Sequence, residues 1–437
     1  MYRWTVIYIV SCDSNNDQLT AASQMFGDIL QSRISDQVAV IICLHMATAD
    51  VHLIDPTYMP SATAGDNITL FYKIDPLPAP VSGKNSKLTL IASENSSFDI
   101  TQKASIQQYF QQRVLQGGFA ASQYALITWG HGAAYGIYYE GTPPMTIPSK
   151  WDMLSMDDLK DAILGAFGSS GNQRINVILM MNCYMQLFDT GFAMHAAQAD
   201  YLICPEAGVD FFGYNYAAIF DQLFGTPAPG MSPLALATLV VTSLNDPAFA
   251  ASQQANLNNL ALYANDLSVY TAMATAMNDL GDALITELTT NSAQILAAGR
   301  SCINNYVNAL YNLVDFFGFV DALKTTLGAT WQPNVMNTIQ TLQAQIVTAR
   351  YLGKSLQTPA KKNFALGFSV CLPTISDNKF YLTYEDPASR FSTFFATSSG
   401  WSRFIKAYVK YLRPAGGVTF SKKGMRSLPR VKGSPGK

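Results

Sequence analysis

Two residues that could perform chemistry each follow a strongly apolar segment of the chain. His131 lies between two glycines directly after the apolar segment 124–129, and Cys183 comes two residues after the apolar segment 175–181. Continuous apolar segments of this length are typical of parallel strands that are buried on both faces. If the two strands are neighbours in one parallel sheet, their carboxyl ends place the imidazole and the thiol at the same edge. The sequence therefore predicts a cysteine–histidine pair there.

Such a pair is suited to nucleophilic catalysis. A cysteine nucleophile needs thiolate character and a proton for the leaving group, and one nearby histidine can serve both needs. The backbone N–H groups of Gly132 and Cys183 are the predicted donors to an oxyanion. The alternative is structural: a hydrogen-bonded histidine and a buried thiol at two strand ends. His195 is the rival imidazole, but its place within a predicted helix favours a packing role.

The elements that must position these residues alternate between strands and helices. Apolar strands are predicted at 5–10, 38–44, 124–129, 175–181 and 201–204, with amphipathic helices between them. Parallel strands need crossover connections, which helices on both faces of a sheet provide. The predicted fold class is therefore α/β, with a mainly parallel sheet covered by helices on both faces.

The first 230 residues are predicted to form this α/β catalytic domain. Within it, residues at about 46–100 hold shorter alternating segments that are bounded by Pro, Gly and Asn. Such a pattern is typical of strands joined by turns, so we expect a hairpin insertion in this part of the domain.

The remainder of the chain has a different pattern. Residues 231–412 are predicted to be mostly helical, with one helix over 335–352 and a late strand at 364–373 that returns to the core. Residues 413–437 hold seven Lys or Arg, no acid, and several Gly, Ser and Pro. This composition predicts a basic flexible tail.

The composition argues against several classes of partner. Hydrophobic residues make up 49% of the 437 residues, and the net charge of −2 gives no bias toward nucleic acid or a membrane surface. No segment reaches the roughly 18 apolar residues of a membrane span, and the run at 5–10 is too short for a secretory signal. We expect a cytoplasmic protein, or a secreted one whose signal was removed. The six cysteines lack zinc-ligand spacing, which predicts no metal and no cofactor.

The residues around the cysteine and the histidine resemble the clostripain family of cysteine peptidases, relatives of caspases, gingipains and legumains. In that family one apolar strand ends in a His-Gly pair and a second ends in the catalytic cysteine, as "ALITWGHG" and "VILMMNC" do here. Further family-like residues occur in the family's order. They are "VIYIVSCDSNNDQL" at 6–19, Met185, Asp189, "ADYLIC" at 199–204, Glu206, "GYNY" at 213–216, "GFSVCLP" at 367–373 and "GWSRFIKAYVKYL" at 400–412.

The resemblance implies a caspase-like fold, a three-layer α/β/α sandwich, and a cysteine endopeptidase that acts on a protein or peptide substrate. Cys183 would be the nucleophile, and His131 would protonate the leaving amine. Asp189 would support the first turn of the helix that follows Cys183. The alternative is a catalytically impaired pseudopeptidase or scaffold, which kept the fold and binds peptide segments without cutting them.

Two residues beside the cysteine depart from the family's pattern. Met181 stands where the family has an acid that helps to bind a basic side chain before the scissile bond (P1), and Asn182 stands where the family has a small residue. A reduced preference for Arg or Lys at P1 is therefore expected, unless another acid replaces the missing one. Met181, Asn182, Glu206 and Asp210 are the candidates for substrate binding. For the two acids, the alternative is that both are solvated loop acids.

The segment at about 137–155, between the histidine and the cysteine, is a predicted regulatory loop. It contains three prolines, which oppose strand pairing and favour exposure to proteolysis, and Lys150. Family members can be cut in this segment, so the resemblance implies Lys150 as a processing site. The alternative is a lid that a substrate or a regulatory protein partner moves while the chain stays intact.

Overall fold

The fold is seen in a computed structural model of the chain. The structure describes residues 1–12, 16–59, 66–94, 98–134, 136–138, 152–168, 173–210, 213–225, 230–306, 313–358, 361–373, 394, 397–398 and 400–412. Lys150, most of the predicted regulatory loop and the basic tail lie outside these residues.

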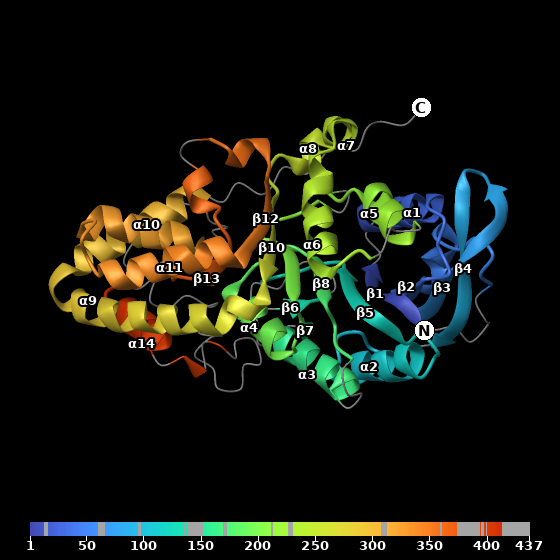
Figure 1. Ribbon diagram of the computed structural model, residues 1–437, viewed down its shortest axis with the longest axis horizontal. Coiled ribbons are helices and arrows are strands. Elements are labelled where there is room, and N and C mark those ends of the chain that lie inside the picture. Colours follow the sequence, from blue (N-terminus) through green and yellow to red (C-terminus); the bar gives the residue numbers. More distant parts are fainter. Residues whose placement is uncertain are drawn as a thin grey trace.

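One nine-stranded sheet forms the centre of the molecule (Figure 1). Its strands follow the order β12-β10-β9-β8-β5-β1-β2-β3-β4. Five adjacent strands are parallel, and all come from the predicted apolar segments: β1 (Tyr2–Cys12), β2 (Val38–Ala47), β5 (Ala121–Trp129), β8 (Val177–Met181) and β9 (Tyr201–Pro205). Most of their side chains are buried on both faces, which explains why these segments are apolar without alternation.

Helices cover both faces of the sheet (Figure 1). One face carries α1 (Asn16–Gln31), α5 (Tyr216–Phe224) and α6 (Pro233–Thr242). The other carries α2 (Lys103–Gln108), its π-helical continuation (Tyr109–Leu115), α3 (Met156–Phe167) and α4 (Phe188–Ala196). Successive residues of β1 enter opposite cores, because strand side chains alternate between faces. The predicted three-layer α/β/α sandwich is confirmed.

The sheet continues past residue 230, because two antiparallel strands from the C-terminal part join it. β10 (Ala261–Asp266) pairs with β9, and β12 (Val347–Leu352) pairs with β10. The single helix predicted over 335–352 is therefore wrong at its end, because α11 stops at Ile346. The β-branched Val347 and Thr348 begin a half-buried alternating segment, which suits an edge strand better than a helix.

Four later helices of the C-terminal part pack as a helical unit at one end of the molecule, on the left in Figure 1. It contains α9 (Tyr270–Tyr306), α10 (Phe316–Leu327), α11 (Pro333–Ile346) and α14 (Gly400–Val409). Short strands β11 (Leu313–Asp315) and β13 (Ser369–Cys371) pair with each other, and a bridge joins Ser369 to Leu187, shortly after Cys183. The late strand thus reaches the catalytic domain. The remaining short elements are β6 (Gly136–Ile137), β7 (Leu154–Ser155), α7 (Pro247–Ser252) and α8 (Gln254–Leu257).

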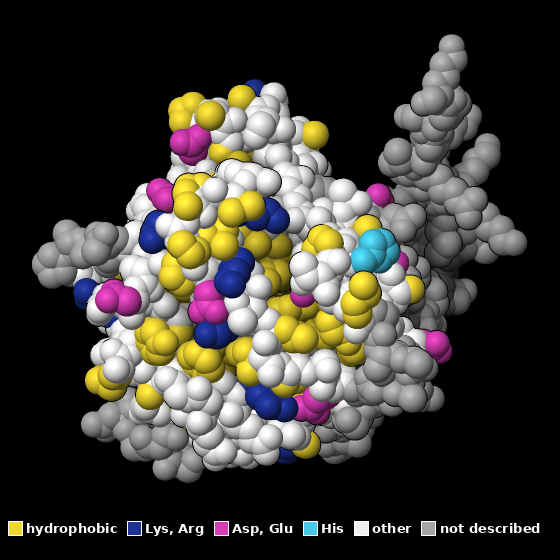
Figure 2. All heavy atoms as spheres, turned by 90° about the vertical axis from the view of Figure 1, so that its right-hand side faces the viewer, with side chains coloured by type: hydrophobic (Ala, Val, Ile, Leu, Met, Phe, Trp, Pro, Cys, Tyr) yellow, Lys and Arg dark blue, Asp and Glu magenta, His cyan; other side chains and the backbone are white. Residues whose placement is uncertain are grey.

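The opposite end of the sheet is a hairpin of β3 (Asn67–Val81) and β4 (Lys84–Glu94), within the region where an insertion is predicted. Figure 2 views this end, where apolar side chains gather among a few lysines and arginines. The exposed Val81, Leu90 and Ile91 belong to the hairpin. In the described part of the chain, no helix has the length and apolar content to cross a membrane.

Candidate active site

The register of two neighbouring strands sets the geometry of the site. β5 and β8 are adjacent and parallel, and their last residue pair is Trp129 with Met181. His131 and Cys183 each follow two residues after that pair, at the carboxyl ends of the strands. The chain therefore places both residues at one edge of the sheet, as the apolar segments predict.

The loop that carries His131 lies against the backbone of the cysteine loop. Gly130 has φ +138°, a conformation that L side chains rarely adopt. A Cβ atom on Gly132 would approach the Cys183 carbonyl oxygen to 2.7 Å and the Cys183 nitrogen to 2.9 Å. Both distances are too short for a side chain, so Gly132 is required for the two loops to pack this closely.

Asn182 ties these two loops together. Its side chain is fully buried, and its Nδ2 donates to the carbonyl oxygens of Gly130, at 3.0 Å, and His131, at 3.1 Å. Its Oδ1 accepts a 2.5 Å hydrogen bond from the Thr128 hydroxyl of β5. A small residue at position 182, which is the family's pattern, could not make these bonds. The departure at this position thus has a structural explanation.

The thiol of Cys183 occupies a partly open position. Cys183 is half-buried, whereas the other five cysteines are buried. The N–H of Val209 donates to its sulfur at 3.3 Å, and the sulfur lies 3.4 Å from the Val209 carbonyl oxygen. Burial raises the pKa of this thiol; the Val209 contact opposes the shift, and the charge of Asp210 adds to it. A thiolate here needs a proton acceptor, which the histidine at the same edge can supply.

Met181, the other departure, is the last residue of β8 and lies in an apolar environment two residues before Cys183. Its side chain is buried, and its sulfur lies 3.5 Å from the Tyr8 hydroxyl of β1. Burial raises the pKa of that phenol well above its usual value, so Tyr8 is neutral as well. Neither group provides the negative charge that a basic P1 side chain would need.

The two acidic candidates for substrate binding, Glu206 and Asp210, occupy different environments. Glu206 is only 3% exposed, and its Oε1 accepts a 2.7 Å hydrogen bond from the Ser369 hydroxyl of β13. The alternative that Glu206 is a solvated loop acid is therefore wrong. Asp210 is exposed, and it directly follows the residue that contacts the thiol. Asp210 is thus the acid that remains at the surface beside Cys183.

The other predicted supporting residues lie on α4, which follows the cysteine loop. Asp189 is in its first turn and is buried, as the expected helix-supporting role requires. His195 is in its last turn, where its Nε2 lies 2.9 Å from the Thr271 hydroxyl of α9. That contact gives His195 a structural partner in the C-terminal helical unit.

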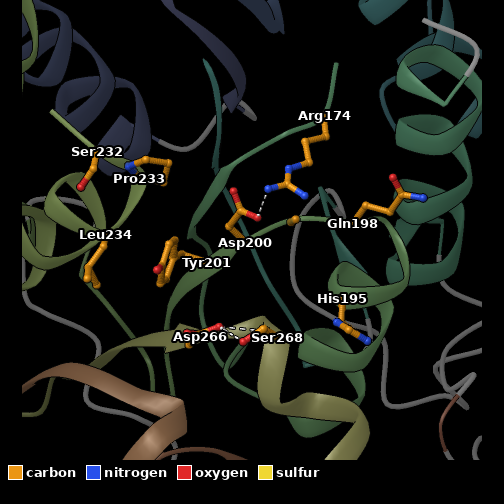
Figure 3. A pocket seen from close by; sticks show the side chains of 11 residues that line it. Arg174, His195, Gln198, Asp200, Tyr201, Ser232, Pro233, Leu234, Asp266 and Ser268 are labelled. Carbon is orange, nitrogen blue, oxygen red and sulfur yellow. Dashed lines mark hydrogen bonds and ion pairs between the residues drawn. The ribbon is translucent and has the colours of Figure 1, made fainter. Parts of the chain in front are cut away.

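His195 also lines a pocket of about 550 Å³, shown in Figure 3. Arg174, just before β8, and Tyr201, the first residue of β9, line the same pocket. The pocket therefore lies at the amino ends of these strands, on the opposite edge of the sheet from Cys183. Its most prominent charged contact is internal, a 2.8 Å ion pair between Arg174 and Asp200.

Sequence reasoning missed two residues that shape the cysteine loop. Val209 contacts the sulfur through its backbone, which no side-chain pattern can reveal. Gln186 is fully buried; its Nε2 donates to the Gly367 carbonyl oxygen at 3.1 Å, and its Oε1 accepts from the Cys204 thiol. A polar residue close after Cys183, between the apolar Met185 and Leu187, was the available signal for Gln186.

Comparison with known proteins identifies the family. The family model of the clostripain family, peptidase C11, matches residues 80–408. The chain belongs to the clostripain family. The resemblance seen in the sequence is thereby confirmed, and with it the assignment to a family of cysteine peptidases. A search of curated proteins finds no match.

Solved structures agree on the fold of this clostripain-family chain. An inactive zymogen of a C11 protease from Parabacteroides distasonis superimposes with a TM-score of 0.58 at 14% identity, covering 92% of this chain and 97% of the other. A secreted C11 cysteine protease from Bacteroides thetaiotaomicron, in complex with an irreversible peptide inhibitor, gives a TM-score of 0.57 at 12% identity, covering 91% of this chain and 99% of the other. The caspase-like architecture is shared over nearly the whole chain.

The contacts of Asn182 lead to a first prediction. Replacing Asn182 with alanine leaves two loop carbonyls without their donor, and a buried polar group without a partner costs about 1–3 kcal/mol. We expect Asn182→Ala to lower the free energy of unfolding in urea by about 3 kcal/mol. Thr128→Val is the comparison variant: it removes the hydroxyl that bonds to Asn182 and to Tyr138 but keeps both carbonyl bonds of Asn182, so a smaller loss of about 1–2 kcal/mol is expected. An Asn182→Ala variant as stable as the wild type would contradict the role of Asn182 in joining the two loops.

Proposed function

We propose that this chain is a cysteine endopeptidase that hydrolyses peptide bonds with Cys183 as nucleophile and His131 as general acid and base. The observation that carries the proposal is the β5–β8 register, which brings the chain's half-buried cysteine and His131 to the same edge of the sheet. Membership of the clostripain family supports the same assignment.

The proposed reaction proceeds in two steps. His131 takes the thiol proton, the Cys183 sulfur attacks the peptide carbonyl carbon, and the carbonyl oxygen becomes an oxyanion. The N–H groups of Gly132 and Cys183 would bind that oxyanion, and one such donor is worth about 3–4 kcal/mol in the transition state. His131 then gives the proton to the leaving amine. In the second step water attacks the thioester, releases the new carboxyl end and restores the thiol.

The proposal predicts that one of the six thiols reacts selectively with an alkylating reagent. Iodoacetamide under native conditions should modify Cys183 alone, because the other five cysteines are buried. Cys183→Ala should abolish both this modification and the cleavage of labelled casein. His131→Ala should lower kcat/KM about 10³-fold, the typical loss for a general acid–base. The exposed His52 provides the control, and His52→Ala should cleave casein at the wild-type rate.

The results distinguish the enzyme from the alternative of a pseudopeptidase. A wild-type chain that is folded and is alkylated at Cys183, yet releases no fragments from casein or from a peptide library, would reject the endopeptidase. Intact-mass spectrometry counts the modified cysteines, and a fluorescence assay measures cleavage on the same samples.

A second part of the proposal concerns specificity. Met181 stands where the family has an acid and is buried against Tyr8, and burying an unpaired Lys or Arg in such an apolar environment would cost several kcal/mol. We therefore infer a P1 preference that is less basic than the family's. Any remaining cleavage after Arg or Lys would depend on the exposed Asp210, since Glu206 is buried against Ser369.

The specificity can be measured with a peptide library. In the wild type, bonds after Arg or Lys should be a minority of those cut, and Asp210→Asn should reduce their cleavage at least tenfold while leaving bonds after apolar residues unchanged. Asp36→Asn, at an exposed turn, is the control and should leave the profile unchanged. A profile dominated by Arg and Lys that persists in Asp210→Asn would refute the inference.

The third part concerns activation. One related structure is described as an inactive zymogen, which supports regulation through the loop at 137–155, with Lys150 as the proposed processing site. The buried Met181 in place of the family's acid argues against self-cleavage after a lysine. It favours the alternative, a lid moved by a substrate or a regulatory protein partner. Intact-mass spectrometry decides between them: a single full-length mass for active wild type excludes obligatory cleavage. Fragments that end near Lys150 in the wild type, and are missing in Cys183→Ala, would establish it.

The cellular location stays a prediction. One related protease is described as secreted, and the structure of this chain does not test the predicted cytoplasmic location.

A further inference from the structure

A buried acid pair joins the C-terminal part to the loop beside the thiol. The pair consists of Glu206, which follows β9, and Asp315, which ends β11; they are 3% and 0% exposed. Their side chains lie within hydrogen-bonding reach of each other, and two carboxyl groups can share a hydrogen bond only when one of them carries a proton. The Ser369 hydroxyl completes the group by donating to Glu206 Oε1 at 2.7 Å.

The surrounding donors show where the proton resides. Asp315 accepts from three backbone N–H groups: Gly318 at 2.6 Å, Leu366 at 2.7 Å and Gly367 at 3.1 Å. Three N–H donors stabilise the ionised form of a carboxyl group. Asp315 is therefore the carboxylate, and Glu206 is the neutral acid that donates to it.

The other groups that face the pair supply no positive charge. Tyr263 of β10 lies beside Glu206, and Cys302 of α9 lies beside Asp315. Among the described residues, neither carboxyl forms an ion pair with Lys, Arg or His. Burial therefore raises the pKa of Glu206 well above its usual value, and the neighbouring Asp315 charge raises it further, whereas hydrogen bonds with Ser369 and Tyr263 oppose part of the shift. When the pH passes this raised pKa, two negative charges face each other in a buried site and the hydrogen bond between them is lost.

A short loop connects the acid pair to Cys183, the proposed nucleophile. Three residues after Glu206, the backbone of Val209 contacts the Cys183 sulfur on both its N–H and its carbonyl side. The intervening Ala207 accepts a hydrogen bond from the Tyr184 N–H, at 3.1 Å. The loop 206–210 thus runs from the acid pair to the thiol, with one further anchor on the cysteine loop.

The segment that binds the acid pair also holds the other side of the cysteine loop. The Ser369 N–H donates to the Gln186 carbonyl oxygen at 2.8 Å, and the Gln186 side chain donates to Gly367. A loss of the Glu206 side-chain bonds would therefore leave the 206–210 loop held through its backbone, by the Glu206 N–H on Ala261 and the Tyr184 N–H on Ala207, and would loosen the loop toward Val209 while residues 184–187 stay attached to β13.

We propose that Glu206, as a neutral acid bonded to Asp315 and Ser369, is a positioning residue that holds the 206–210 loop against Cys183, and that loss of its proton releases this loop at alkaline pH. The inference gives Glu206 a role away from the substrate and rests on the proposed function of Cys183 as nucleophile. Asp210, which belongs to the same loop, would move with it.

The test compares wild type with Glu206→Gln between pH 6 and pH 10. Glutamine can donate to Asp315 and accept from Ser369, but it has no proton to lose in this range. The rate at which the wild type cleaves labelled casein, divided by the rate of Glu206→Gln, should be at least threefold lower at alkaline pH than at pH 6.5. At alkaline pH, Cys183 of the wild type should react with iodoacetamide at least threefold faster than Cys183 of Glu206→Gln, because the loop no longer covers the sulfur. Glu287→Gln on α9 is the matched control and should follow the wild type.

A second variant tests positioning without titration. Glu206→Ala should reduce casein cleavage at least tenfold at pH 7 and accelerate alkylation of Cys183. If this variant fails to fold, Ser369→Ala removes one of the hydrogen bonds to Glu206 and should show the same changes to a smaller extent. Profiles of wild type and Glu206→Gln that coincide up to pH 10 would overturn the release. Wild-type cleavage by Glu206→Ala would overturn the positioning role.

The two proposals can fail separately. If the wild type does not cleave casein, the proposed function fails, but the alkylation rate of Cys183 still reports the position of the loop in every variant. If casein is cleaved and neither rate responds to Glu206, the positioning role fails while the peptidase assignment stands.

Discussion

The parallel pairing of β5 with β8 is the constraint on which the rest of the site depends. A slip of one residue in this register would turn every side chain of one strand to the opposite face. Trp129 and Met181 fix the register because both are buried between the sheet and its helices. Once they are in place, His131 and Cys183 must leave the sheet side by side. The apolar core thus sets the positions of His131 and Cys183, and the loops need only hold the two residues that follow each strand.

Those loops are held by polar contacts in an almost uncharged environment. Asn182 connects the histidine loop to the cysteine loop, and Gly132 allows their backbones to touch. Burial makes the thiol a weak acid by itself, so its activation depends on a partner that shares its proton. The proposed preference for less basic substrates rests on the same feature, because Met181 stands where the family has an acid. The proposed activation of the thiol and the proposed specificity are therefore linked through the burial of uncharged residues at the end of β8.

Much of this arrangement could be predicted from the sequence, because it depends on local periodicity. The five parallel strands are continuous apolar segments, and the positions of His131 and Cys183 after two of them follow directly. The strand β12 was missed because its residues continue the helical pattern of α11 and its pairing partner, β10, is far away in the chain. The buried state of Glu206 could not be predicted either. Its partners Ser369 and Asp315 are more than one hundred positions away, and in sequence it looks like any acid in a loop.

The C-terminal part is therefore a component of the site, although it supplies neither member of the proposed pair. It extends the sheet with β10 and β12, and β13 lies along the segment that follows Cys183. A peptidase domain that ended near residue 230 would leave the Glu206 carboxyl without Ser369 and the Gln186 Nε2 without Gly367, and burial of these groups without those partners would be unfavourable. Asn182 and the Gln186 Oε1, by contrast, are satisfied within the catalytic domain. The loops around the thiol are thus held from both sides, by the catalytic domain and by a segment from the last third of the chain.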